Sequence, residues 1–122
     1  MITRIVKREA AKRDLIRQWV WYAENASFEV ADRFLTAADT TVADVATHAG
    51  SGQPVFTRRS DLQGMRRIPV GDGFEKFLLF YFPIQEGVEL VRSIQPEGTG
   101  TRGVRFNIDL GSNFWYKSYA VA

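Results

Sequence analysis

The stretch DLQGMRRIPVGDGFEKFLLFYF, from Asp61 to Phe82, decides the fold. Met65 to Val70 alternates with a period of two and predicts a strand, either at a sheet edge or with a bulge at Pro69. Gly71-Asp72-Gly73 supplies a turn. Phe74 to Phe82 then carries apolar residues on both faces, as a central strand covered on both sides requires. This stretch therefore predicts two neighbouring strands, one of them in the middle of a sheet.

Two helices are predicted before this stretch. From Ala11 to Ala26 apolar residues recur every three or four positions and predict an amphipathic helix. Ser27 is suited to cap a second helix, which ends at the Gly/Pro-rich break from Gly50 to Pro54. The expected core stripe of the first helix is Ala11, Leu15, Trp19, Tyr22 and Ala26, widened by Ile16, Val20 and Ala23. That of the second is Phe28, Ala31, Phe34 or Leu35, Ala38, Val42, Val45 and Ala49. A helical hairpin follows from this arrangement.

Short strands complete the expected order. Ile2 to Val6 reads as a brief strand, residues 83–87 as a turn, and Val88 to Ile94 as a further strand. The fold class is α+β, with the order β-α-α-β-β-β and the helical hairpin packed on a small, mainly antiparallel sheet. Beyond it, the alternation from Val104 to Leu110, followed by residues 114–121, makes an extra C-terminal hairpin plausible.

Composition narrows the class of protein. A chain of 122 residues with 45% hydrophobic residues suits one folded domain. The absence of cysteine excludes thiol catalysis and favours a reducing compartment, so we expect a cytoplasmic location. The sequence shows neither a signal peptide nor a membrane span, and its single histidine makes no metal site, so no metal or cofactor is expected. Residues 28–49 are acidic and leave the remainder basic, which suits nucleic acid or an acidic protein as partner.

A family resemblance is carried by ordered motifs. Along the chain these are A-x-x-D-L-I from Ala11, A-x-x-F-L from Ala31, DLQGMRRIPV from Asp61, GFEKFLLFY from Gly73 and VELVRSI from Val88. The order and spacing resemble the RelE/ParE superfamily of bacterial type II toxin–antitoxin toxins, the ParE branch more than the RelE branch. The resemblance runs from Ala11 to Ile94, about three quarters of the chain, and implies a toxin domain in residues 1–96, with residues 97–122 as an atypical C-terminal extension.

The two branches imply different targets. A ParE-like toxin binds and inhibits DNA gyrase in plasmid-stabilisation modules and is neutralised by a cognate antitoxin in a hetero-oligomer. A RelE-like toxin is an endonuclease that cuts mRNA on the ribosome. The third alternative is an inactive relative that only binds the antitoxin. We expect the gyrase-binding toxin.

RNA cleavage needs a base for the 2′-hydroxyl, a cation for the phosphate and a proton donor. The candidates are Arg66, Tyr81 and Arg92, but no base lies beside them in sequence. The His-Gly-x-Arg type motif that commonly ends the family's last strand is replaced here by Gln95-Pro96-Glu97-Gly98, which weakens the nuclease interpretation. Tyr81 is more simply a core tyrosine with its hydroxyl at the rim.

The candidate partner-binding residues are Arg58, Arg59, Arg66, Arg92 and Trp21. Arg66 and its neighbour Arg67 should point to opposite faces of their strand, so at most one of them belongs to any single patch. Arg92, expected on the same strand face as Leu90 and Ile94, either pairs with a carboxylate or reaches the working face of the sheet. Trp21 lies off the helical core stripe and is a candidate for an exposed contact.

Overall fold

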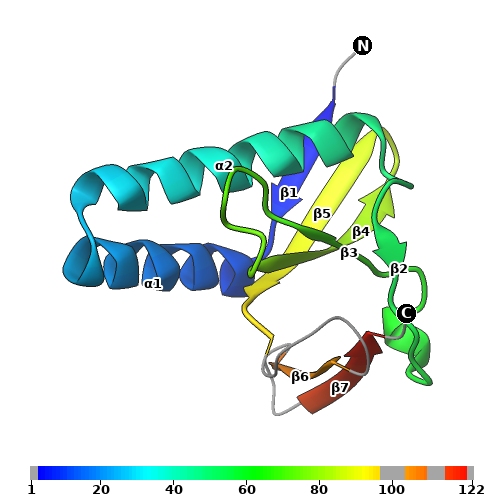
Figure 1. Ribbon diagram of the computed structural model, residues 1–122. Coiled ribbons are helices and arrows are strands. Elements are labelled where there is room, and N and C mark those ends of the chain that lie inside the picture. The colour runs from blue at the N-terminus through cyan, green and yellow to red at the C-terminus, as the bar shows by residue number, and fades with distance from the viewer. Residues whose placement is uncertain (1–2, 97–103, 110–114, 121–122) are drawn as a thin grey trace.

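Two layers, a hairpin of two helices and a sheet, make up most of the chain (Figure 1). The computed structural model describes residues 3–96, 104–109 and 115–120. Helices α1 (Glu9–Asn25) and α2 (Phe28–Thr47) form a hairpin on one face of a five-stranded sheet. The sheet order is β1-β5-β4-β3-β2. The predicted α+β class and the helical hairpin are confirmed.

The strands of the large sheet are β1 (Arg4–Lys7), β2 (Gln53–Pro54), β3 (Arg66–Pro69), β4 (Leu78–Ile84) and β5 (Gly87–Ile94). β1 pairs with β5 in parallel, whereas β5, β4, β3 and β2 follow one another antiparallel. The sheet is therefore mainly antiparallel, as predicted. β2 and the 3₁₀-helix η1 (Ser60–Leu62) were not predicted, because two or three residues carry too little periodicity to recognise.

The central strand begins later than the sequence predicted. Phe74 to Phe77 forms a turn, in which the Phe77 N–H donates to the Phe74 carbonyl at 3.0 Å, and β4 starts at Leu78. At its other end the strand continues through Pro83, which was predicted to be in the turn. Proline is tolerated there because β3 opposes only Leu78 to Tyr81, so no strand on that side requires the missing N–H. The turn itself centres on Gln85 and Glu86, with Glu86 at φ 64°.

β3 lies inside the sheet rather than at its edge, but β2 covers only Arg66 and Arg67. Pro69 lies beyond the end of β2, so β3 has no strand partner on that side at this position. The predicted edge position of this proline is therefore confirmed.

Ser27 caps α2 as predicted, because its Oγ accepts from the Val30 N–H at 3.1 Å. The predicted core stripes are narrower in the structure. Ile16 is 63% exposed, Val20 is also exposed, and Phe28 is 69% exposed at the first position of α2. The reason is that α1 turns toward the sheet a face on which Asp14 and Gln18 accompany Ala11, Leu15 and Tyr22.

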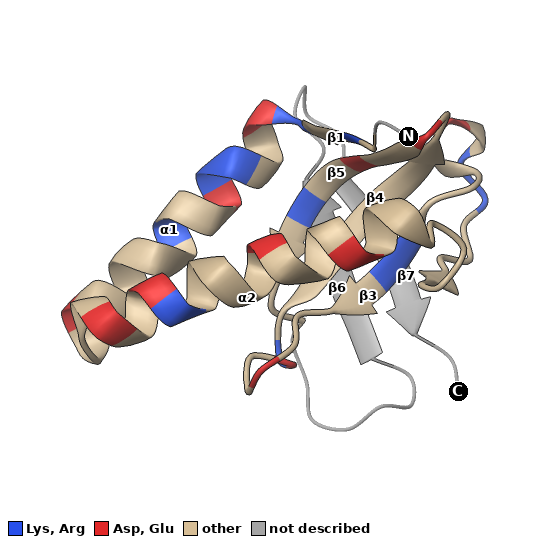
Figure 2. Cartoon of the chain, turned by 90° about the horizontal axis from the view of Figure 1, so that it is seen from above, with Lys and Arg blue, Asp and Glu red and all other residues tan. Residues whose placement is uncertain are grey.

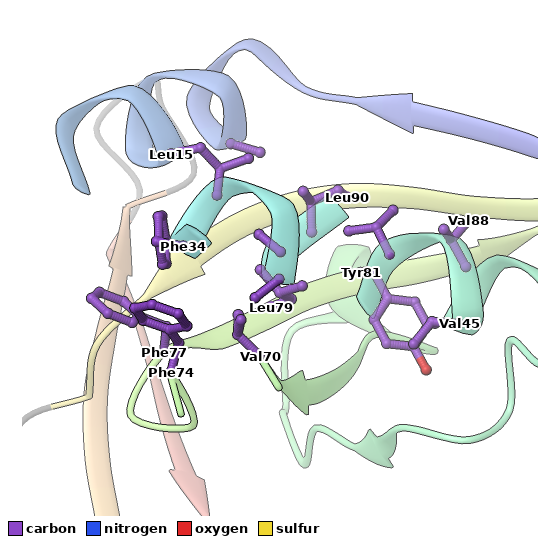
Figure 3. Packing of buried hydrophobic residues seen from close by; sticks show 14 of the residues in the cluster. Leu15, Phe34, Val45, Val70, Phe74, Phe77, Leu79, Tyr81, Val88 and Leu90 are labelled. Atoms are coloured by element: carbon purple, nitrogen blue, oxygen red, sulfur yellow. The ribbon is translucent and has the colours of Figure 1, made fainter. Parts of the chain in front are cut away.

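Both faces of β4 contribute to packing. The main core lies between the sheet and the helices, where Leu79 and Tyr81 meet Phe34, Val88 and Leu90 (Figure 3). On the opposite face Phe80 packs with Val55, Leu62 and Met65 in a smaller cluster. The prediction of a strand covered on both faces is thus confirmed for β4.

The C-terminal hairpin is also confirmed. β6 (Val104–Asp109) pairs antiparallel with β7 (Trp115–Ala120), with Val104 opposite Ala120 and Asp109 opposite Trp115. These strands form a separate two-stranded sheet.

Candidate partner-binding surfaces

α1 closes the open edge of β5. β1 accompanies β5 only as far as Leu90, and past that point the edge of β5 meets the helix instead of a strand. The Ser93 N–H donates to Asp14 Oδ2 at 3.0 Å, and Gln18 Nε2 donates to the Ser93 carbonyl at 2.8 Å. Asp14 and Gln18, one helical turn apart, therefore satisfy the backbone groups that a neighbouring strand would otherwise pair.

Arg92 pairs with the same carboxylate. Its Nε donates to Asp14 Oδ2 at 2.6 Å and its Nη2 donates to Oδ1 at 2.9 Å, while Arg17 Nη2 reaches Oδ1 at 3.1 Å. The Asp14 side chain is only 5% exposed, so these donors replace the water that a buried carboxylate loses. Of the two roles open to Arg92 from the sequence, the structure shows the ion pair.

A bulge changes the strand face on which Arg92 was expected. The β4–β5 register shifts between Phe80 and Tyr81, so that Tyr81 lies opposite Leu90 while Phe80 lies opposite Arg92. Arg92 therefore shares its register face with Ile94, as predicted, but not with Leu90. An inserted residue of this kind reverses the alternation beyond it, which a strict period of two does not anticipate.

Beside this ion pair lies a partly open hollow of about 500 Å³. We call it the α1–β5 hollow. It is lined by Asp14, Arg17, Gln18, Trp21, Lys76, Phe77, Arg92, Ser93, Ile94 and Gln95. Trp21 is 52% exposed, as its position off the helical stripe predicted, and the amino group of Lys76 lies 5.5 Å from the centre of its ring. The hollow brings together two of the five predicted partner-binding residues, Trp21 and Arg92.

Arg66 and Tyr81 meet elsewhere, at directly opposed positions of β3 and β4. The Tyr81 hydroxyl donates to the Ala49 carbonyl at 2.8 Å and accepts from the Gly52 N–H at 2.9 Å. Arg66 Nη1 donates to the carbonyls of Gly50 and Gly52 at 3.1 and 2.5 Å. Together they fasten the segment that follows α2 to the sheet, and we call this group the 49–52 latch.

Burial shapes the acidity of the latch tyrosine. Tyr81 is buried, and the loss of water raises the pKa of its hydroxyl above the ordinary value. The hydrogen bond from Gly52 and the charge of Arg66 act in the opposite direction and offset part of that rise in pKa. Tyr81 is thus a core tyrosine with a hydrogen-bonded hydroxyl.

The last two predicted residues lie in the segment between β2 and β3, which we call the arginine loop. Arg58 is exposed, while Arg59 Nε donates to Asp61 Oδ1 at 3.0 Å and its Nη2 contacts Oδ2. The hydrogen bond from Arg59 lowers the pKa of Asp61. The exposed ring of Phe56 belongs to the same segment. The arginine loop therefore presents one exposed guanidinium and one that is paired.

Charge is distributed unevenly over the helices (Figure 2). α2 carries four acidic residues, Glu29, Asp32, Asp39 and Asp44, against Arg33, whereas on α1 the basic residues Lys12, Arg13 and Arg17 are balanced by Glu9, Asp14 and Glu24. Within residues 3–96 and the two strands of the hairpin, no cluster of His, Asp or Glu is placed to hold a metal ion. No helix in the described part of the chain has the length and apolar character needed to span a membrane.

Asp14, Gln18 and Lys76 were not among the predicted site residues. For Asp14 and Arg92 the sequence does contain a signal: each is a charged residue at a position that periodicity assigns to an apolar face. Such a charge is almost always paired when it is buried, so an acid and a base in this situation on different elements are candidates for one another. Lys76 carries no such signal, because it lies in a turn.

Comparison with known proteins agrees with this architecture. A family model described as "ParE toxin of type II toxin-antitoxin system, parDE" matches residues 5–96. Among solved structures, one described as "Chromosomal ParDE TA system from P. aeruginosa" aligns with a TM-score of 0.62 and 15% sequence identity. The alignment covers 78% of this chain and 97% of that chain, and it shows a shared fold. The search of curated protein sequences returned no match.

Proposed function

The chain belongs to the family of ParE toxins of type II toxin–antitoxin systems, and from this premise we propose that it acts by binding and inhibiting DNA gyrase. In the same proposal a cognate antitoxin neutralises it in a hetero-oligomeric complex in the cytoplasm. Residues 1–96 are the toxin domain, and residues 97–122 are an extension outside the matched family range.

One observation supports inhibition by binding: the residues that RNA cleavage would use already make hydrogen bonds within the fold. A general acid or base has to reach the reacting group and exchange a proton near neutral pH. The Tyr81 hydroxyl is buried, holds two backbone partners and has a raised pKa, so it is poorly suited to either role. Arg66 and Arg92 likewise donate to groups of the fold. This favours an inhibitor over a nuclease.

Two surfaces are available for partners. The α1–β5 hollow offers an exposed tryptophan beside cationic side chains, which is the composition of a protein-binding hot spot. The arginine loop offers Arg58 and Arg59, with the aromatic ring of Phe56. We assign partner binding to these surfaces, and in this proposal Arg66 acts by holding the 49–52 latch next to the arginine loop.

The proposal is tested by adding purified protein to two assays in parallel. One measures supercoiling of relaxed plasmid by gyrase, and the other measures the integrity of mRNA in a translating extract. We expect supercoiling to stop and the mRNA to stay intact, and the antitoxin to restore supercoiling. A protein that leaves gyrase active while cutting mRNA is instead a RelE-like endonuclease. A protein that binds the antitoxin but affects neither assay is an inactive relative.

A matched variant sharpens the nuclease arm. Tyr81→Phe removes only the hydroxyl, and Tyr22→Phe is its control at another buried tyrosine. Loss of mRNA cleavage in Tyr81→Phe, with Tyr22→Phe unaffected and both proteins folded, is the result that favours the endonuclease.

A further inference from the structure

We propose that the α1–β5 hollow binds an acidic peptide segment in which a carboxylate side chain lies next to a large apolar one. The inference rests on the proposed function, because the segment is assigned to the antitoxin. It adds the site on the toxin and the chemistry that the site recognises.

Charge in the hollow favours an anion. Its lining carries Arg17, Lys76 and Arg92 against the single carboxylate of Asp14. The charge of Arg92 is neutralised by its buried ion pair with Asp14. Arg17 is 71% exposed and donates from only one nitrogen of its guanidinium to that carboxylate. Two cationic groups are thus left at the rim to receive a carboxylate.

Lys76 is held in an unusual way for an exposed lysine. Its amino group lies 5.5, 5.5 and 5.4 Å from the ring centres of Trp21, Tyr22 and Phe77. Among the ion pairs of the described residues none involves Lys76. Aromatic rings attract the ammonium group but do not neutralise it. The three rings therefore restrain the position of this charge, and it remains available to an incoming anion.

The apolar half of the ligand is indicated by Trp21, Phe77 and Ile94, which line the same hollow. An exposed indole beside a ring already packed in the core offers a ready surface for one more large apolar side chain. The ligand therefore has to present a carboxylate and an apolar group side by side. Two side chains have this arrangement on neighbouring turns of a helix or at alternate positions of a strand.

A peptide fits these features better than nucleic acid does. Nucleic-acid binding draws its affinity from several cations that follow a run of phosphates. Here the cations Arg17, Lys76 and Arg92 gather at one hollow instead of following a line of phosphates. A single carboxylate needs no such run.

The experiment measures the affinity of the full chain for the protein encoded beside it as antitoxin, by calorimetric titration at low and high salt. The test variants are Trp21→Ala, Lys76→Glu and Arg17→Gln, where glutamine avoids a second acid next to Asp14. The matched controls are Phe28→Ala, Arg33→Glu and Arg13→Gln, which change exposed residues outside the hollow. Thermal melting verifies that each variant is folded.

We expect Trp21→Ala to weaken binding about 30-fold, as for a central aromatic contact. Lys76→Glu should weaken it about tenfold at low salt, with a smaller effect at high salt, because a rim charge acts through a screened attraction. Arg17→Gln should follow Lys76→Glu in direction and salt dependence. The controls should stay within about twofold of the unchanged protein.

Folded hollow variants that bind as tightly as their controls would overturn the inference while leaving the toxin assignment intact. Variants that keep the antitoxin but lose gyrase inhibition would assign the hollow to gyrase and also overturn it. If the same variants instead lose binding to a labelled single-stranded oligonucleotide, the ligand is nucleic acid. If the unchanged protein does not bind the antitoxin at all, the proposed function itself fails.

Discussion

Arg92 on β5 donates to both carboxylate oxygens of Asp14 on α1, at 2.6 and 2.9 Å, across 78 positions of sequence. The pair joins the end of the last strand of the large sheet to the first helix, at the point where β1 no longer covers β5. Both residues also line the α1–β5 hollow. Arg17, one of the two rim cations, is therefore held in place by a carboxylate that belongs to the fold.

We predict that Asp14→Ala lowers the free energy of unfolding by about 3 kcal/mol, because it leaves Arg92 without its anion and the Ser93 N–H without its acceptor. Urea unfolding followed by tryptophan fluorescence measures this loss. Asp44→Ala, on the exposed face of α2, is the control and should change stability by less than about 0.5 kcal/mol. Equal effects of the two substitutions would mean that the buried pair contributes nothing to stability.

Tyr81→Phe should cost about 1 to 3 kcal/mol of unfolding free energy. The substitution keeps the ring in the core but leaves the Ala49 carbonyl and the Gly52 N–H without their buried partner. Tyr22→Phe is the matched control, since the Tyr22 hydroxyl makes no hydrogen bond to another residue within the described part of the chain, and it should cost less than about 0.5 kcal/mol. Chemical denaturation measures the free energy of unfolding of both variants, and equal losses would contradict the prediction.

The raised pKa of Tyr81 predicts that the free energy of unfolding depends on pH. Burial raises the pKa of Tyr81 in the folded chain, so above about pH 10 the unfolded chain releases this proton first. The stability that the tyrosine contributes is therefore complete below the unfolded pKa and declines as pH rises through the folded pKa. The difference in unfolding free energy between the unchanged protein and Tyr81→Phe should be constant near neutral pH and shrink above about pH 10. A difference that grows in alkali would contradict the raised pKa.

Gly52→Ala is predicted to loosen the 49–52 latch. A Cβ on Gly52 would lie 2.8 Å from the Arg67 carbonyl oxygen and would overlap the Tyr81 hydroxyl. Backbone and core ring both resist displacement, so we expect a loss of about 1 to 3 kcal/mol. Gly50→Ala is the control, because a Cβ there meets nothing within 4 Å. Comparable melting temperatures for the two variants would show that the latch tolerates the extra carbon.

The sequence predicted the layers of this fold better than its details. Helical periodicity located α1 and α2, and the doubly apolar run in β4 placed it at the centre of the sheet. The boundaries of β4 were misplaced because Phe74 and Phe77 are core residues that reach the main cluster from a turn. A pattern of apolar residues reports burial, and it cannot tell a strand from a turn that is buried at one end.

For the candidate sites the limit was long-range pairing. Trp21 was recognised as exposed from its helical position alone, whereas its neighbour Lys76 lies far away in sequence and came to it through the packing of α1 against the sheet. The register shift between Phe80 and Tyr81 places Arg92 and Leu90 on opposite faces of β5. No residue type in that stretch predicts the shift. Both features depend on how elements pack, which a single sequence does not encode locally.

The last prediction concerns the extension. The family match covers residues 5–96, and residues up to 96 form both helices, the five-stranded sheet and two hydrophobic clusters. A chain ending at residue 96 should therefore unfold in one cooperative transition, with a melting temperature within about 5 °C of the full chain. Scanning calorimetry of the two forms measures this. Loss of the cooperative transition in the shorter form would mean that residues 97–122 are part of the toxin domain rather than an addition to it.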